Sequence, residues 1–217
     1  DTQAQEMAGH AIAEAVKRSK VSKEEIDDVI IGAAGQQGSQ QGNIARQSLL
    51  RAGLPVSVAG MSLDRQCASG MMAIATAAKE ITEDGMTITV GGGVESVSLV
   101  RNENFRMDRA RDPWLEKNIP SLYMTMIETA ENVAKRYGIS RESQDEYSLQ
   151  SQMRTAKAQQ NGYMDKEIVP LKSTMKYKDK ETGEISSHNV CIEKDEGNRP
   201  STTLEGLSAL KPVFKDG

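Results

Sequence analysis

Residues 62–81, SLDRQCASGMMAIATAAKEI, place a cysteine between an apolar run and a helical pattern of small residues. Residues 58–63 have the length and the apolar or β-branched content of a short buried strand. After the cysteine, apolar side chains recur every three or four residues, which predicts one face of a helix. These side chains are Ala68, Met71, Met72, Ala75, Ala78 and Ile81. Cys67 is therefore predicted at, or just before, the first turn of that helix.

This predicted position favours chemistry at the sulfur of Cys67. The first turn of a helix has unpaired backbone N–H groups and the positive end of the helix dipole, and both favour an anion. A cysteine at such a place is more readily a thiolate, the form that attacks a carbonyl carbon. The small residues at 68–70 allow a substrate to approach closely. The alternative is a buried structural cysteine, because free cysteines are among the most buried residues.

The residues before and after this stretch alternate between helix and strand patterns. Helices are predicted over residues 4–15 and from the cap Asn43 through Leu50, with a short capped turn opened by Ser22 and Glu25. Strands are predicted over residues 28–33, 58–63 and 86–91, with a loop at 35–42. Such alternation indicates an α/β layered domain.

The run of Gly91, Gly92 and Gly93 has two possible explanations. No GxGxxG opens a helix after it, so a dinucleotide cradle is not indicated. We predict instead that these glycines allow close backbone packing beneath Cys67.

The second part of the chain has a different pattern. Residues 98–120 are charged and irregular, which suggests a surface loop or an assembly contact, and the arginines there are Arg101, Arg106, Arg109 and Arg111. Helices are predicted at about 121–137 and 141–161, the second capped by Ser140. Residues 164–199 are polar and weakly β-like, with a turn at 180–184. The simplest division is a core over residues 1–97 and an inserted region over 98–217.

Composition limits the classes of function. A net charge of −4 over 217 residues argues against nucleic-acid or anionic-membrane partners, and no apolar run is long enough to cross a membrane. Two cysteines are too few for a disulfide framework, and a reactive thiol favours a reducing compartment, either a bacterial cytoplasm or an organelle matrix. The two histidines and two cysteines lie far apart in sequence, so no metal site is predicted.

Several long blocks, in the same order, resemble the thiolases, the acyl-CoA C-acyltransferases. They are residues 32–64 (GAAGQQGSQQGNIARQSLLRAGLPVSVAGMSLD), 62–81, 88–98 (ITVGGGVESVS), 128–162 (ETAENVAKRYGISRESQDEYSLQSQMRTAKAQQNG) and 199–217 (RPSTTLEGLSALKPVFKDG). The resemblance covers essentially the whole chain. It implies a helix/sheet/helix fold in which residues 1–97 form an N-terminal half-core and residues 98–217 a helical loop domain that binds coenzyme A. A homodimer or homotetramer is also implied.

The resemblance assigns chemistry to individual positions. It implies an acyltransferase of fatty acid metabolism in which Cys67 forms an acyl-cysteine intermediate, with ping-pong kinetics. The reaction is thiolytic cleavage of 3-ketoacyl-CoA by CoA, or the reverse Claisen condensation of two acetyl-CoA. CoA and acyl-CoA are substrates, and no cofactor is covalently bound. The backbone N–H of Cys67 resembles the family's oxyanion-hole donor for the thioester carbonyl.

Two residues of the second region match CoA-contacting positions. Met126 in YMTMIETAEN resembles a residue that lines the pantetheine and acyl pocket, although core packing would also explain it. Arg199 in NRPSTTLEGL resembles an arginine that contacts the nucleotide end of CoA, and a solvated arginine is the alternative. Thr125 replaces the histidine of short-chain biosynthetic members, which leaves longer acyl chains open. Gly206 replaces a serine that binds adenine in some members.

The resemblance also implies parts that these residues do not supply. Family members open with a central strand and continue into a second half that contributes a histidine, a second cysteine and an asparagine to the site. We therefore expect activity to require that C-terminal half, since neither Cys191, His188 nor His10 lies in a matching motif. The alternatives are an incomplete or non-catalytic CoA-binding subunit that needs a partner chain, or a β-ketoacyl synthase. The block at 128–162 argues against the synthase.

Overall fold

The computed structural model describes residues 2–214 of a chain that divides into two compact units. Unit 1 comprises Asp1–Arg106 and Val169–Glu193, and unit 2 comprises Met107–Ile168 and Lys194–Gly217. Position 1 and positions 215–217, the end of the predicted second domain, lie outside the described residues. The predicted domain boundary between residues 97 and 98 stays a prediction.

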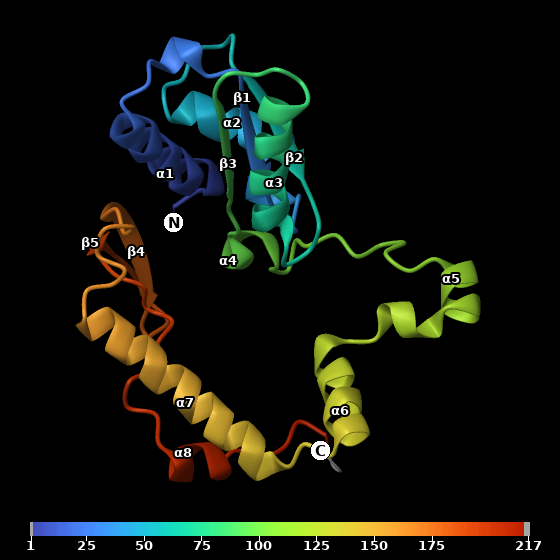
Figure 1. Ribbon diagram of the computed structural model, residues 1–217. Coiled ribbons are helices and arrows are strands. Elements are labelled where there is room, and N and C mark those ends of the chain that lie inside the picture. The colour runs from blue at the N-terminus through green and yellow to red at the C-terminus, as the bar shows by residue number, and fades with distance from the viewer. Residues whose placement is uncertain (1, 215–217) are drawn as a thin grey trace. The chain divides into compact units, whose positions relative to one another are not determined.

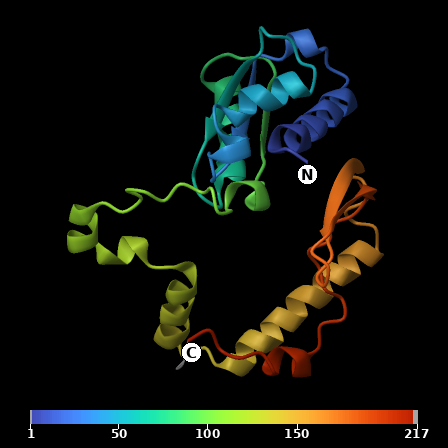
Figure 2. The ribbon, with the colours of Figure 1, turned by 180° about the vertical axis from the view of Figure 1, so that it is seen from behind.

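Unit 1 is a three-layered α/β arrangement with a separate hairpin. Its elements are α1 (Ala4–Ser19), η1 (Lys23–Glu25), β1 (Asp28–Gly32), η2 (Gly38–Gln40), α2 (Ile44–Arg51), β2 (Ala59–Leu63), α3 (Ser69–Thr82), β3 (Thr89–Gly93), α4 (Val97–Val100), β4 (Leu171–Lys178) and β5 (Ile185–Ile192). The first three strands form a parallel sheet in the order β2-β1-β3. Helices α1 and α2 cover one face and α3 covers the other (Figures 1 and 2). This confirms the predicted helix/sheet/helix layering.

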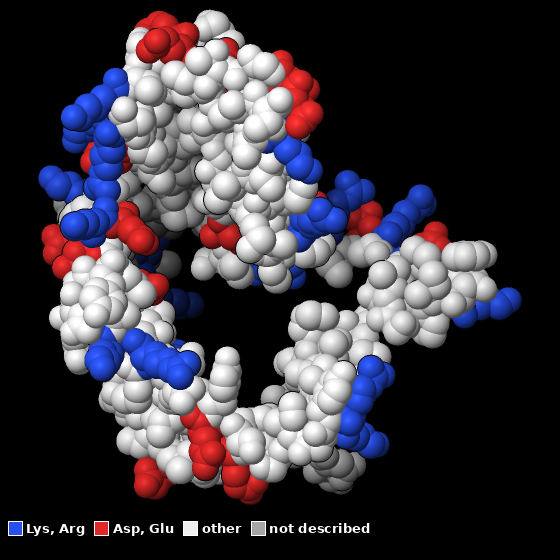
Figure 3. All heavy atoms as spheres, viewed as in Figure 1, with Lys and Arg blue, Asp and Glu red and all other residues white. Residues whose placement is uncertain are grey.

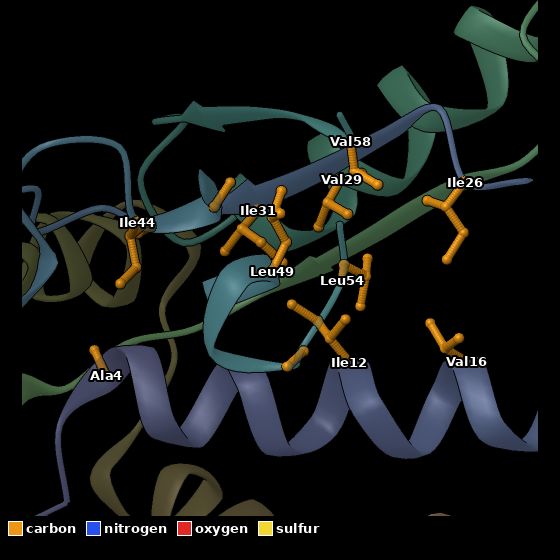
Figure 4. Packing of buried hydrophobic residues seen from close by; sticks show 13 residues of the cluster. Ala4, Ile12, Val16, Ile26, Val29, Ile31, Ile44, Leu49, Leu54 and Val58 are labelled. Carbon is orange, nitrogen blue, oxygen red and sulfur yellow. The ribbon is translucent and has the colours of Figure 1, made fainter. Parts of the chain in front are cut away.

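The central strand β1 is buried on both faces. Val29 and Ile31 point toward α1 and α2, where Figure 4 shows them near Ile12 and Leu49. Ile30 points to the opposite face, where it packs with the alanines of α3. A strand buried on both sides is a continuous apolar run rather than an alternating one, and DVIIG fits this pattern.

Local capping determines where the helices begin. The Asn43 side chain accepts from the Arg46 backbone N at 3.0 Å and starts α2, as predicted. Ser22 and Glu25 form the predicted capping box, at the start of a 3₁₀ turn. Ser140 accepts from the Ser143 N at 3.2 Å and starts α7.

Two sequence-based details were wrong, and a third feature was not predicted. Strand β3 starts at Thr89 rather than at 86 and includes all three glycines. Helix α6 starts at Met126 rather than at 121, because Thr125 forms a capping box with Glu128. The predicted apolar stripe of α3 faces away from the sheet, and Met71 is 76% exposed. Small residues lie on both sides of α3, so its periodicity could not tell which side packs on the strands.

Unit 2 is helical. Its elements are α5 (Pro113–Asn118), η3 (Pro120–Tyr123), α6 (Met126–Tyr137), α7 (Arg141–Gln160) and α8 (Leu204–Ser208). Helix α7 confirms the prediction for residues 141–161. Within the segment predicted as irregular, α5 is opened by Asp112, whose side chain accepts from the Leu115 N at 2.9 Å.

The weakly β-like segment forms a regular antiparallel hairpin, β4–β5, in unit 1. The Asp179 carboxylate accepts from the Glu181 N and the Thr182 N, at 2.9 and 2.8 Å, and so closes the turn that the sequence indicated.

Acidic and basic side chains are interspersed over the face in Figure 3. None of the helices within residues 2–214 has the length and apolar content to cross a membrane.

Candidate active site

Cys67 lies in the turn that leads from the carboxyl end of β2 into α3. It is exposed and two residues before the first residue of the helix. The N-cap residue Ala68 has no side chain that can accept a hydrogen bond, and no side-chain cap is formed. The N-terminus of α3 is therefore open to an anion, and Cys67 lies where the sequence predicted it. Its exposure argues against a buried structural cysteine.

The turn itself has an unusual backbone. Gln66 adopts the left-handed conformation, with φ of +52°, directly before the cysteine. The Asp64 carboxylate accepts from the Gln66 N at 2.7 Å, and this bond supports that conformation. The turn thus presents Cys67 at the surface at a defined place between strand and helix.

Glycines let α3 sit directly on the sheet. A Cβ on Gly91 would lie 2.8 Å from Cα of Ile74, and one on Gly93 would lie 3.1 Å from Cα of Gly70. On the central strand, a Cβ on Gly32 would lie 2.2 Å from the carbonyl carbon of Ser69. Close backbone packing on α3 is therefore confirmed for Gly91 and Gly93, whereas a Cβ on Gly92 would meet only Ile31 Cδ1, at 3.8 Å.

A polar network around the buried Gln40 lies at the same edge of the sheet, where β1 and β3 end. The Glu95 carboxylate accepts from the Ala34 N at 2.8 Å and from Gln40 Nε2 at 2.7 Å. Gln40 is fully buried, donates to the Gly35 carbonyl at 2.8 Å and accepts from the Ser96 N. Sequence reasoning missed this pair. Two signals were available: a glutamate two residues after a glycine-rich strand, and a glutamine-rich loop after β1.

The CoA-contact candidate Met126 lies in unit 2, as the first residue of α6. Its side chain is 74% exposed, so core packing within the described unit does not explain it. It borders a mainly apolar cavity of about 410 Å³. The other lining residues are Thr129, Ala130, Val133, Ala134, Ile139 and Gln144.

Arg199, also in unit 2, is exposed and its backbone is anchored to α7. Gln152 Oε1 accepts from the Arg199 N at 2.8 Å and from Asn198 Nδ2, also at 2.8 Å. The anchor leaves the guanidinium in solvent. Met126 and Arg199 thus lie in unit 2, whereas Cys67 belongs to unit 1.

The remaining candidates lie elsewhere. Cys191 is exposed on β5 opposite Lys172, and His188 on the same strand forms a hydrogen bond with Ser186 at 3.0 Å. His10 lies on α1. Across residues 2–214, no three or more acidic, histidine or cysteine side chains group as metal ligands.

Two buried carboxyl groups lie at the opposite edge of the sheet, where β1 begins and α3 ends. Burial raises the pKa of Glu80, and the nearby charges of Asp28 and Asp84 raise it further. Burial also raises the pKa of Asp28, although its carboxylate accepts from the Val29 N at 2.6 Å. These shifts therefore concern stability rather than the Cys67 edge.

Comparison with known proteins gives one consistent family. The model of the thiolase N-terminal domain matches residues 1–217. The chain is 40% identical to a beta-ketoadipyl-CoA thiolase of Pseudomonas putida, covering 89% of this chain and 49% of that protein. It is 38% identical to a 3-ketoacyl-CoA thiolase of Bacillus subtilis, covering 94% and 51%.

A solved structure supports the same assignment. The Bacillus anthracis acetyl-CoA acetyltransferase superposes with a TM-score of 0.80 at 35% identity, covering 99% of this chain and 54% of that one. The chain thus spans about half the length of the curated relatives it matches. With its strand–cysteine–helix turn, its glycine-packed sheet and a family match along its whole length, this chain belongs to the thiolase family, in its N-terminal domain.

Proposed function

We propose that this chain supplies the acyl-accepting part of a thiolase. In the condensing direction the Cys67 thiolate attacks the thioester carbonyl of acetyl-CoA, a new thioester forms on Cys67, and CoA leaves as its thiolate. A second acetyl-CoA then provides the carbon nucleophile, and thiolysis of 3-ketoacyl-CoA is the reverse. The observation that carries this proposal is the exposed Cys67 before the uncapped N-terminus of α3.

Unit 2 is proposed to hold the CoA part of the substrate. Met126 borders an apolar cavity that suits a pantetheine or acyl chain. The permanently charged guanidinium of Arg199 suits the phosphates of the nucleotide end, and the Gln152 anchor fixes where its side chain starts.

The complete reaction is proposed to need groups beyond these residues. We expect the base for the thiol to come from a further segment or a companion chain, since His188 bonds to Ser186, His10 lies on α1, and neither lies in a matching family motif. The family match over 1–217 favours this activity over a β-ketoacyl synthase. The homodimer or homotetramer and the reducing compartment stay predictions.

The test is mass spectrometry of the complete protein that contains these residues, with any companion chain present, after brief incubation with acetyl-CoA. We expect one acetyl group on the peptide that contains Cys67, lost in Cys67→Ala and retained in Cys191→Ala. CoA binding, measured by calorimetry, should weaken in Arg199→Ala and stay unchanged in Arg154→Ala, an exposed arginine of the same unit. CoA binding without acetylation would indicate the non-catalytic subunit instead.

A further inference from the structure

The turn that carries Cys67 is closed by the side chain of Ser69. Ser69 Oγ accepts from the Arg65 N at 2.8 Å and donates to the Gln66 carbonyl at 2.6 Å. The residue is only 4% exposed, so its hydroxyl lies largely out of solvent, and both bonds are partly buried. One hydroxyl thus joins the two residues before the cysteine to the first residue of α3.

These bonds hold a backbone conformation that is unfavourable by itself. A non-glycine residue in the left-handed region costs about 1–2 kcal/mol, and Gln66 occupies that region. Its N–H is held by Asp64 and its carbonyl by Ser69. The residue before the nucleophile is therefore fixed from both sides.

Fixing the Gln66 carbonyl also fixes the N–H of Cys67. The carbonyl of one residue and the N–H of the next belong to one planar peptide group, and in a trans peptide they point in opposite directions. No peptide bond is cis in the described chain. The hydroxyl of Ser69 therefore sets the direction of the Cys67 N–H without touching it.

We propose that Ser69 is a positioning residue that aims the Cys67 backbone N–H at the oxygen of the substrate thioester. This inference rests on the proposed function, in which that N–H stabilises the oxyanion formed when Cys67 attacks. Without the hydroxyl, the Gln66 carbonyl keeps only the bond from the Ser69 backbone N, at 3.0 Å. The Gln66–Cys67 peptide is then held less firmly, and its N–H points less accurately at the developing charge. The loss affects acyl transfer, which needs an oxyanion donor, far more than simple alkylation of the sulfur, which does not.

The test compares two reactions of Cys67 in Ser69→Ala: acetylation by acetyl-CoA and alkylation by iodoacetamide, both followed by mass spectrometry. We expect acetylation to fall at least about tenfold, because removal of a complete oxyanion donor costs on the order of 100-fold or more. Alkylation of Cys67, relative to Cys191 as an internal reference, should stay close to wild type. Ser69→Thr, which keeps the hydroxyl, should restore acetylation.

The matched control is Ser62→Ala. Ser62 Oγ also makes two hydrogen bonds, accepting from the Ala45 N at 3.0 Å and donating to Asn43 Oδ1 at 2.9 Å, but it supports the start of α2. This variant should change stability without changing the ratio of acetylation to alkylation. Wild-type acetylation of Ser69→Ala, or equal losses in both reactions, overturns the inference and leaves the proposed function standing. Wild-type protein that is alkylated at Cys67 but never acetylated overturns the proposed function first, and with it this inference.

Discussion

Replacing Gly32 with alanine should push the N-terminus of α3 off the sheet. The new Cβ would lie 2.2 Å from the carbonyl carbon of Ser69, 2.3 Å from its oxygen and 2.6 Å from the Gly70 N. Ordinary contact begins at 3.4 Å, so strand and helix have to separate by about 1.2 Å. All three neighbours are backbone atoms, and no side-chain rotation relieves the clash.

Two effects of this displacement are expected. Overpacking of this kind costs about 1–3 kcal/mol of unfolding free energy. A displacement of about 1 Å at a reacting group lowers its rate on the order of 100-fold. Gly92→Ala is the matched control, because its Cβ meets only Ile31 Cδ1, at 3.8 Å.

Urea unfolding and the rate of Cys67 acetylation by acetyl-CoA measure the two effects. Gly32→Ala should lose both stability and acetylation, whereas Gly92→Ala should change little. Equal acetylation rates and equal unfolding midpoints for the two variants would refute the argument that backbone contact between β1 and α3 positions the cysteine.

Two further predictions concern charged groups away from the cysteine. Because the pKa of Glu80 is raised, first by burial and then by Asp28, its protonated form is favoured in the fold, and the stability it contributes at low pH is lost as the pH rises through the raised value. Glu80→Gln should therefore raise the urea midpoint at neutral pH, and this gain should fade below about pH 4. The control Glu83→Gln, at an exposed site, should leave the midpoint unchanged. An effect of Glu80→Gln that does not depend on pH would contradict this argument. Arg141 donates to both oxygens of Asp145, at 2.9 and 3.0 Å, and to the carbonyls of Leu207 in α8 and Leu210 just after it, at 2.8 and 3.0 Å. A lysine cannot make these four hydrogen bonds, so Arg141→Lys should lower the free energy of unfolding by about 1–2 kcal/mol and speed proteolysis near α8. Unchanged stability and proteolysis would show that these bonds are dispensable.

Features set by neighbouring residues could be predicted from the sequence. The alternation of elements, the Asn43 cap and the place of Cys67 before a helix all depend on patterns within a few positions. The same is true of the turn at Asp179. Local propensity and capping act over about one turn of the chain, so they can be predicted without knowledge of the tertiary structure.

Features set by residues far apart in the sequence could not be predicted. Glu95 and Gln40 meet across 55 positions, and nothing local marks Gln40 as buried or the two as partners. The outward direction of the α3 stripe depends on which side of the helix meets glycines of β1 and β3. The role of Ser69 was hidden for a different reason, since a serine at the start of a helix looks like an ordinary small residue until its two partners are seen.

The capping box that opens α6 limits how residue 125 can change during evolution. Thr125 Oγ1 accepts from the Glu128 N at 3.2 Å, and the Thr125 N donates back to the Glu128 carboxylate at 2.8 Å. Histidine, which the resemblance places here in short-chain biosynthetic thiolases, is not among the residues that cap helices well, and losing the cap costs about 0.5–2 kcal/mol. The neighbouring Met126 is the first residue of the same helix. Exchange of Thr125 is therefore coupled to the stability of α6, and a lineage that exchanges it is expected to acquire a compensating substitution close by.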